Sequence, residues 1–169
     1  MERHSLEAIV TALNTAQARY LVAGGLAVVA HGYVRFTADV DLVIDLEPPN
    51  VSRAITALEG LGYRPRAPVA FSEFSDAATR AQWARDRHMT VFCVYSPLHA
   101  MTEIDVFIEP PLDFDAAYRR AVRKEIAPGV TATFVSLDDL RQMKRLAGRP
   151  QDLLDLENLT PRNPEALDE

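Results

Sequence analysis

The chain has 169 residues, which is enough for one domain with its own core and leaves little room for a second. Apolar residues make up 48% and charged residues 25%, a composition typical of globular proteins that excludes disorder over most of the length. The formal net charge of −6 argues against a protein that coats nucleic acid in general, because neutralising phosphates requires concentrated lysine and arginine.

Membrane insertion and export are not expected. The longest apolar stretch, 20–30, is far shorter than the roughly 20 residues that a membrane-spanning helix needs, and two glycines interrupt it. The N-terminal residues lack a basic region followed by an apolar core and a small-residue cleavage site, which is the pattern of an export signal. We therefore expect a cytoplasmic protein without membrane contact.

The chain is expected to open with a helix, a strand and a second helix. Apolar residues at helical spacing follow Ser5, the expected cap of the first helix. Residues 20–23 predict a short buried strand. Gly24-Gly25 breaks that strand and precedes an apolar, alanine-rich segment over 26–31. These residues predict a strand-turn-helix junction at the two glycines.

A second strand is expected over 39–45, where apolar and acidic residues alternate. Because side chains alternate between the faces of a strand, this pattern predicts one apolar and one acidic face. Pro48-Pro49 closes the strand, and helices are expected over 51–61 and 77–87.

Further strands are expected over 89–95, 104–108 and 130–135, which are rich in β-forming residues, and a helix over 114–122. The only cysteine, Cys93, lies within the first of these strands and is expected to act as a small core residue without a chemical role.

A basic helix is expected to end the domain. Ser136 caps its start, with Asp139 in the third position, and 148–150 interrupts it before 151–159 resumes. The whole pattern predicts a single α/β (α+β) domain over 1–160 with a small mixed sheet flanked by helices, followed by a flexible tail over 161–169.

Two carboxylates project from one face of the strand expected over 39–45. Asp39 and Asp41 are two residues apart, so they point to the same side, while Val40 and Leu42 point into the core. Two like charges side by side are costly unless a proton or a divalent cation neutralises them. Mg²⁺ prefers carboxylate oxygens and is usually shared with substrate phosphates. We interpret the pair as part of a magnesium site; an exposed acidic strand face is the alternative.

A third carboxylate, Asp105, interrupts an apolar strand, where an unpaired charge is expensive. If the two strands are neighbours, Asp105 lies beside Asp39 and Asp41, and three such carboxylates can hold two metal ions. Asp105 is then expected to bind one ion and to help deprotonate an attacking hydroxyl. The alternative is a buried aspartate satisfied by backbone N–H groups or by an arginine.

The C-terminal part of the domain carries a local concentration of positive charge. Eight of the 18 basic residues lie there: Arg119, Arg120, Arg123, Lys124, Arg141, Lys144, Arg145 and Arg149. Lys144 is a candidate to bind a triphosphate through its single positive charge, and Arg149 is a candidate to bind it through a bidentate guanidinium group. The alternative is that these residues form a solvated helix face. Asp152 and Asp155 are expected to pair with Arg149 or Arg145.

Three motifs occur in a characteristic order: Gly24-Gly25-Leu26-Ala27, then Arg35-Phe36-Thr37-Ala38-Asp39-Val40-Asp41-Leu42, then Ile104-Asp105-Val106. Together they resemble the nucleotidyltransferase superfamily typified by DNA polymerase beta. The likeness is closest to the small bacterial members, the minimal nucleotidyltransferases and the toxin-like or aminoglycoside-adenylylating proteins. It covers 20–108 and extends to the segment 144–153.

The resemblance implies transfer of a nucleoside monophosphate from an NTP to an acceptor, with release of pyrophosphate. It implies two Mg²⁺ ions bound by the three aspartates. Gly24 and Gly25 would approach phosphate through backbone N–H groups, since glycine permits close contact. Arg35 would pair with phosphate and Thr37 would tighten the turn before the acidic strand, with a surface arginine and a turn threonine as the alternatives.

The acceptor is left open by the sequence: RNA, a protein or a small molecule. Two alternatives to a general nucleotidyltransferase follow from the same residues. One is a catalytically silent nucleotide-binding partner in a toxin-antitoxin or regulatory complex. The other is an antibiotic adenylyltransferase, for which a partner protein or a homodimer would have to complete the acceptor pocket.

Overall fold

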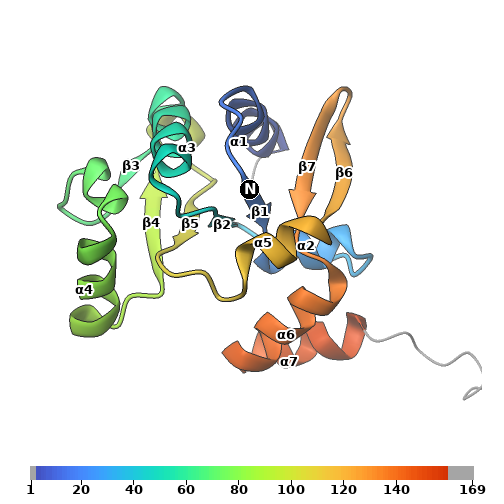
Figure 1. The fold of residues 1–169 in the computed structure, drawn as a ribbon. Coiled ribbons are helices and arrows are strands. Elements are labelled where there is room, and N and C mark those ends of the chain that lie inside the picture. Colours follow the sequence, from blue (N-terminus) through green and yellow to red (C-terminus); the bar gives the residue numbers. More distant parts are fainter. Residues whose placement is uncertain (1–2, 160–169) are drawn as a thin grey trace, which may run out of the picture.

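The computed structural model describes residues 3–159, which form a seven-stranded mixed sheet flanked by helices (Figure 1). The strands are β1 (Tyr20–Val22), β2 (Val40–Ile44), β3 (Arg64–Pro65), β4 (Val91–Tyr95), β5 (Ile104–Phe107), β6 (Val122–Ala127) and β7 (Val130–Phe134). The helices are α1 (Arg3–Thr15), α2 (Gly24–Ala30), α3 (Pro48–Gly60), α4 (Ala77–Arg87), α5 (Phe114–Arg119), α6 (Leu137–Ala147) and α7 (Pro150–Leu159), with short 3-10 turns η1 (Phe71–Ser75) and η2 (Pro97–His99).

The strand order across the sheet is β3-β4-β5-β2-β1-β7-β6. Strand β2 is parallel to β5 and β1 is parallel to β7, whereas the other neighbouring pairs are antiparallel. The expected α/β class with a mixed sheet is therefore confirmed. The predicted tail over 161–169 lies outside the described residues.

The core fills the space between the sheet and two neighbouring helices, α1 and α3 (Figure 1). Leu13 of α1 and Val51 of α3 are fully buried, as are Val40 and Leu42 of β2. Toward the other end of the sheet, Trp83 of α4 stacks on Phe92 of β4 with 5.2 Å between ring centroids. The alternation of β2 thus buries one side of the strand and leaves the acidic side toward the opposite face.

The predicted helix over 114–122 is wrong in its last three residues, because α5 ends at Arg119 and Val122 begins strand β6. Strand β6 forms a hairpin with β7 at the edge of the sheet, and its turn contains Gly129 with φ +74°. Its central residues are exposed and polar, so the strand lacks the buried apolar pattern that would have indicated it.

Two local expectations near the helix starts are also wrong. Ser5 does not cap α1; it lies inside the helix, fully buried, with its Oγ 2.9 Å from Nδ1 of His99. Pro48 and Pro49 do not merely close β2, because they form the first residues of α3, where a proline without an N–H is tolerated. The cap at Ser136 is confirmed, since its Oγ accepts the Asp139 N–H at 3.2 Å.

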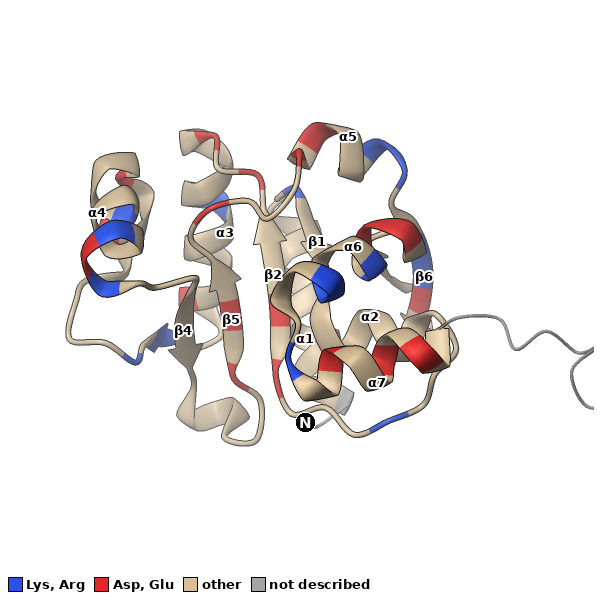
Figure 2. Cartoon of the chain, turned by 90° about the horizontal axis from the view of Figure 1, so that it is seen from below, with Lys and Arg blue, Asp and Glu red and all other residues tan. Residues whose placement is uncertain are grey.

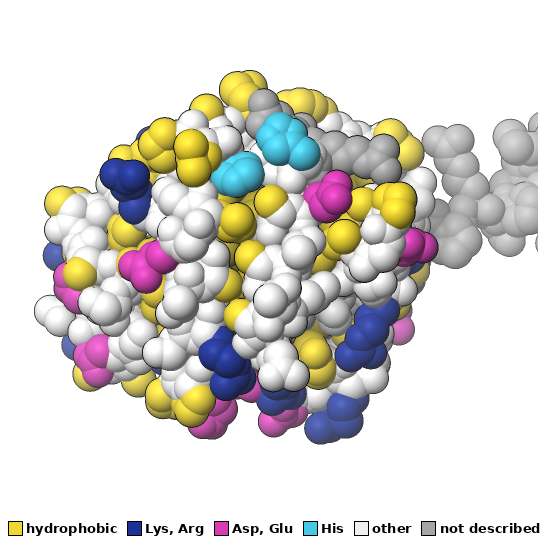
Figure 3. Space-filling view, turned by 90° about the horizontal axis from the view of Figure 1, so that it is seen from above, with side chains coloured by type: hydrophobic (Ala, Val, Ile, Leu, Met, Phe, Trp, Pro, Cys, Tyr) yellow, Lys and Arg dark blue, Asp and Glu magenta, His cyan; other side chains and the backbone are white. Residues whose placement is uncertain are grey.

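The acidic face of β2 and β5 is visible from below in Figure 2, with α6 and α7 beside it. The opposite side of the molecule, in Figure 3, carries charged side chains of both signs scattered among apolar and polar ones. None of the helices within residues 3–159 combines the length and apolar character needed to cross a membrane.

Candidate active site

Strands β2 and β5 place two of the predicted carboxylates side by side. The strands are parallel neighbours, and Asp41 is the register partner of Asp105. The residues that flank these aspartates, among them Leu42 and Val106, are buried on the other face of the sheet. The expectation that a neighbouring strand brings Asp105 to the acidic strand is confirmed. Asp39 precedes β2 and is exposed, outside the cavity that the other two aspartates line.

Gly24 has a packing role that its residue type alone did not reveal. A Cβ atom built on Gly24 would lie 1.8 Å from Oδ2 of Asp41, and the backbone at Gly24 has φ +56°. The Ala23 N–H also donates to the Asp41 carbonyl at 2.9 Å. A glycine is therefore needed both for the left-handed turn into α2 and for the space that the Asp41 carboxylate occupies.

Gly25 makes the same kind of room for the segment before β2. A Cβ atom there would lie 2.5 Å from Oγ1 of Thr37 and 3.0 Å from a guanidinium nitrogen of Arg35. Arg35 does not line the cavity; its guanidinium binds Asp155 of α7, with Nε 2.8 Å from Oδ1 and Nη2 3.0 Å from Oδ2. Arg35 and Thr37 thus connect α2, the segment before β2 and α7, and neither lines the cavity.

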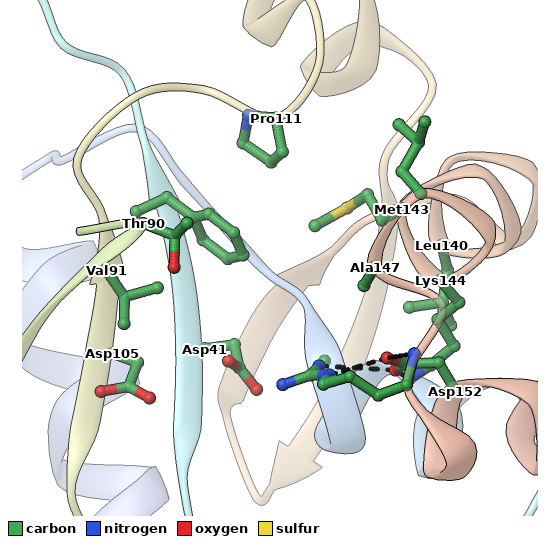
Figure 4. Close-up of a pocket in the computed structure, with 14 residues that line it drawn as sticks. Asp41, Thr90, Val91, Asp105, Pro111, Leu140, Met143, Lys144, Ala147 and Asp152 are labelled. Atoms are coloured by element: carbon green, nitrogen blue, oxygen red, sulfur yellow. Dashed lines mark hydrogen bonds and ion pairs between the residues drawn. The ribbon is translucent and has the colours of Figure 1, made fainter. Parts of the chain in front are cut away.

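A cavity of about 480 Å³ opens between α6 and the face of the sheet formed by β2 and β5 (Figure 4). This volume is within the range of small-molecule sites. Five of the residues predicted from the sequence line it: Gly24, Asp41, Asp105, Lys144 and Arg149. The cavity also has an apolar wall that was not predicted, because isolated apolar residues carry no signal in a sequence. This wall consists of Phe107, Pro111, Leu140, Met143, Leu146 and Ala147.

Lys144 lies on the side of this cavity opposite Asp105 (Figure 4), and Arg149 also lines the cavity. The Lys144 ammonium lies 2.9 Å from Oδ1 of Asp152 and 2.6 Å from Oδ2 of Asp155, and its side chain is only 5% exposed. Arg149 Nε lies 2.7 Å from Oδ2 of Asp152. A solvated helix face is therefore the wrong interpretation for Lys144. The predicted pairing with Arg149 or Arg145 is confirmed for Asp152, which binds Arg149, and is wrong for Asp155, which binds Lys144 and Arg35.

These contacts form one charged cluster of three cations and two carboxylates: Arg35, Lys144, Arg149, Asp152 and Asp155. Hydrogen bonds and charge from the cations keep the pKa values of Asp152 and Asp155 below their ordinary range despite burial. Both carboxylates are therefore ionised, and the cluster has one positive charge in excess. That charge faces Asp41 and any anion that enters the cavity.

Asp41 has the most perturbed carboxyl group of the site. Burial, together with the nearby charges of Asp105 and Asp39, raises its pKa from 3.8 to about 6, against the opposing effects of Arg149 and Lys144. Burial also raises the pKa of Asp105. None of these three aspartates forms an ion pair with a described side chain, so the site concentrates negative charge without neutralising it locally.

The stability of the protein should depend on the ionisation of Asp41. A raised native pKa means that the folded protein holds this proton more tightly than the unfolded chain does. The protonated Asp41 carboxyl therefore contributes its full share of the folding stability below about pH 4, and this share is lost as the pH rises through 6. At neutral pH, Asp41→Asn should therefore be more stable than wild type by about 1–3 kcal/mol. Urea denaturation at neutral pH and near pH 4 measures this, and the difference should disappear at the lower pH. Equal stability at neutral pH would contradict it.

The donor set fits a hard divalent cation held by Asp41 and Asp105. Both groups are carboxylates, they are adjacent, and their mutual repulsion is what such an ion would relieve. Within residues 3–159 no three His, Cys, Asp or Glu side chains are already arranged as a metal site. Mg²⁺ commonly completes its coordination with waters and substrate phosphates, so two protein carboxylates suffice to hold one ion. A second ion, and the participation of Asp39, stay predictions.

Comparison with known proteins does not place the chain in a family. No protein-family model matches it, and no curated protein matches it either.

Proposed function

We propose that the protein is a Mg²⁺-dependent nucleotidyltransferase that moves a nucleoside monophosphate from an NTP to an acceptor. One observation carries the proposal: Asp41 and Asp105 are register partners at one wall of a cavity whose facing wall carries Lys144 and Arg149. Carboxylates for a cation on one side and cations for phosphates on the other are the two needs of phosphoryl transfer.

Each residue of the site has a distinct task in this proposal. Asp41 and Asp105 hold Mg²⁺, and Lys144 and Arg149 bind the β- and γ-phosphates, where the excess positive charge of the cluster lies. The bound metal supplies charge that stabilises the phosphate oxygens during transfer. Asp105 accepts the proton of the acceptor hydroxyl, whose oxygen forms a bond to the α-phosphorus as the bond to pyrophosphate breaks. The apolar wall, which includes Phe107 and Ala147, excludes water from the cavity.

Calorimetric titration with ATP tests the proposal. Wild type should bind ATP with Mg²⁺ and only weakly without it, because the aspartates repel a naked triphosphate. Asp105→Asn should reduce transfer of labelled nucleotide to acceptors by about a hundredfold or more, with the fold intact. Glu109→Gln removes an exposed carboxylate just after β5 that does not line the cavity, and should change neither measurement.

Two results would decide against the proposal. ATP affinity that is independent of Mg²⁺ in wild type and unchanged in Asp41→Asn would exclude the metal site. Metal-dependent ATP binding without transfer to any RNA, protein or small-molecule acceptor would instead support the silent nucleotide-binding alternative.

A further inference from the structure

The sheet face that carries the two aspartates continues beyond the cavity to the edge of the sheet. In register, Cys93 of β4 lies opposite Asp105, and Arg64 of β3 lies opposite Tyr95 of β4. Residues two apart on a strand share a face, so Cys93 and Tyr95 lie on the face of Asp41 and Asp105. Cys93 is half-buried on this face, contrary to its predicted place in the core.

Two arginines and a tyrosine form the outer part of this face, which we call the edge surface: Arg64, Arg66 and Tyr95. The Arg66 guanidinium forms an ion pair with Glu103 and lies 5.5 Å from the centroid of the Tyr95 ring. The Arg66 side chain is 57% exposed, and the residue Tyr95 as a whole is 36% exposed. Arg64 is exposed and makes no ion pair or side-chain hydrogen bond with the described residues, so its charge is not neutralised.

The edge surface is open to solvent and lies on the other side of Asp105 from the phosphate-binding cations. In Figure 2 no helix of the described chain stands in front of β4 and β5, whereas α6 and α7 flank β2. Strand β3 is two strand spacings from β5, or roughly 10 Å. A molecule on the edge surface can therefore place a hydroxyl at Asp105 without meeting Lys144 or Arg149.

We propose that the edge surface binds the acceptor, and that the acceptor is a single-stranded polynucleotide whose terminal hydroxyl reaches Asp105. This inference rests on the proposed function. Guanidinium groups match backbone phosphates in geometry and charge, and the exposed Tyr95 ring offers a face on which a base stacks. The terminal 3′ oxygen forms the bond to the α-phosphorus, its proton passes to Asp105, and pyrophosphate leaves.

Positive and negative charges are separated along this face. The acids of this face are Asp39, Asp41 and Asp105 at its inner end, where Mg²⁺ would neutralise Asp41 and Asp105, and Glu103, which Arg66 already pairs. At the outer end, Arg64 leaves one positive charge, unpaired within the described residues, near the Tyr95 ring. The protein with its net charge of −6 would thus hold only a short terminal segment, rather than coat a long strand.

Binding of a fluorescein-labelled, single-stranded oligonucleotide of about ten nucleotides, measured by anisotropy without NTP, tests the inference. RNA and DNA of the same sequence form separate arms. Arg64→Gln/Arg66→Gln and Tyr95→Ala should each weaken binding about tenfold. Arg119→Gln/Arg123→Gln removes two exposed arginines near the opposite edge of the sheet and should change binding less than twofold. ATP affinity with Mg²⁺ should be unchanged in all three variants, which also shows that they are folded.

The outcomes separate this inference from the proposed function. Transfer of label to the oligonucleotide, lost when its 3′ hydroxyl is phosphorylated, would support the inference, and the arm that accepts label identifies RNA or DNA. Absent oligonucleotide binding, equal weakening in the control variant, or transfer to a protein or small molecule would overturn it while leaving Mg²⁺-dependent ATP binding intact. Absence of that ATP binding in wild type would overturn the proposed function itself.

Discussion

Asp155→Ala is expected to lower the free energy of unfolding by about 3–5 kcal/mol, because it leaves Arg35 without its carboxylate partner and Lys144 with one carboxylate, Asp152, where it had two. Asp155 is fully buried and binds both Lys144 of α6 and Arg35 of the segment before β2. Lys144 itself is almost completely buried, so its charge cannot turn to water when Asp155 is removed. Urea denaturation at neutral pH measures the loss.

A matched variant separates this effect from the removal of any aspartate. Asp138 lies on α6 and also pairs with a basic residue, Arg141, at 3.6 Å, but its side chain is 92% exposed. Asp138→Ala should change stability by less than about 1 kcal/mol. If Asp155→Ala were as mild as Asp138→Ala, the cluster would not hold α7 to the domain, and the buried-charge argument would be wrong.

Gly24→Ala is the second change with a large expected effect, a loss of about 2–4 kcal/mol together with loss of Mg²⁺-dependent ATP binding. The added methyl group would overlap the Asp41 carboxylate, with only 1.8 Å between Cβ and Oδ2, and the residue would have to keep φ +56°. Relief of the overlap must displace the Asp41 carboxylate from the position in which it would hold Mg²⁺ together with Asp105. Thermal denaturation and ATP titration measure the two consequences.

Two controls divide this effect into backbone strain and overlap. Gly148 has a similar φ of +61°, and a Cβ atom there would lie 3.8 Å from its nearest neighbour. Gly148→Ala should therefore show strain alone, about 1 kcal/mol. In an Asp41→Gly background, Gly24→Ala should cost no more than Gly148→Ala. A full cost in that background would mean that Asp41 is not what Gly24 accommodates.

Strong local patterns were sufficient to predict most of the fold. The alternation around β2 indicated a half-buried strand, Gly24-Gly25 indicated the junction with α2, and Ser136 indicated the start of α6; the structure has all three. Strand β6 was missed because an exposed edge strand has no apolar side to reveal it. Ser5 was misassigned because a serine beside an apolar run resembles a cap, whereas its contact with His99, distant in sequence, is what buries it.

The site shows the same division between local and distant information. That Asp41 and Asp105 interrupt apolar strands is visible in the chain itself, because a carboxylate at such a place needs a partner. That Arg35 binds Asp155 instead of facing the cavity depends on where α7 packs, 120 residues further along. The same packing engages Lys144 with two carboxylates, so its charge reaches the cavity as part of a cluster.

Residue type and spacing by themselves determined the α/β class, the acidic face of β2 and the positions where glycine is required for a turn, because each depends on the backbone preferences of a few neighbouring residues. Only the tertiary structure decided which strand lies beside β2, that Gly24 and Gly25 make room for Asp41 and Thr37, and which carboxylates hold the basic residues of α6 and α7. The physical reason is that charge pairing and close packing depend on distances between segments that are far apart in the chain, and these distances are set when the sheet and helices assemble.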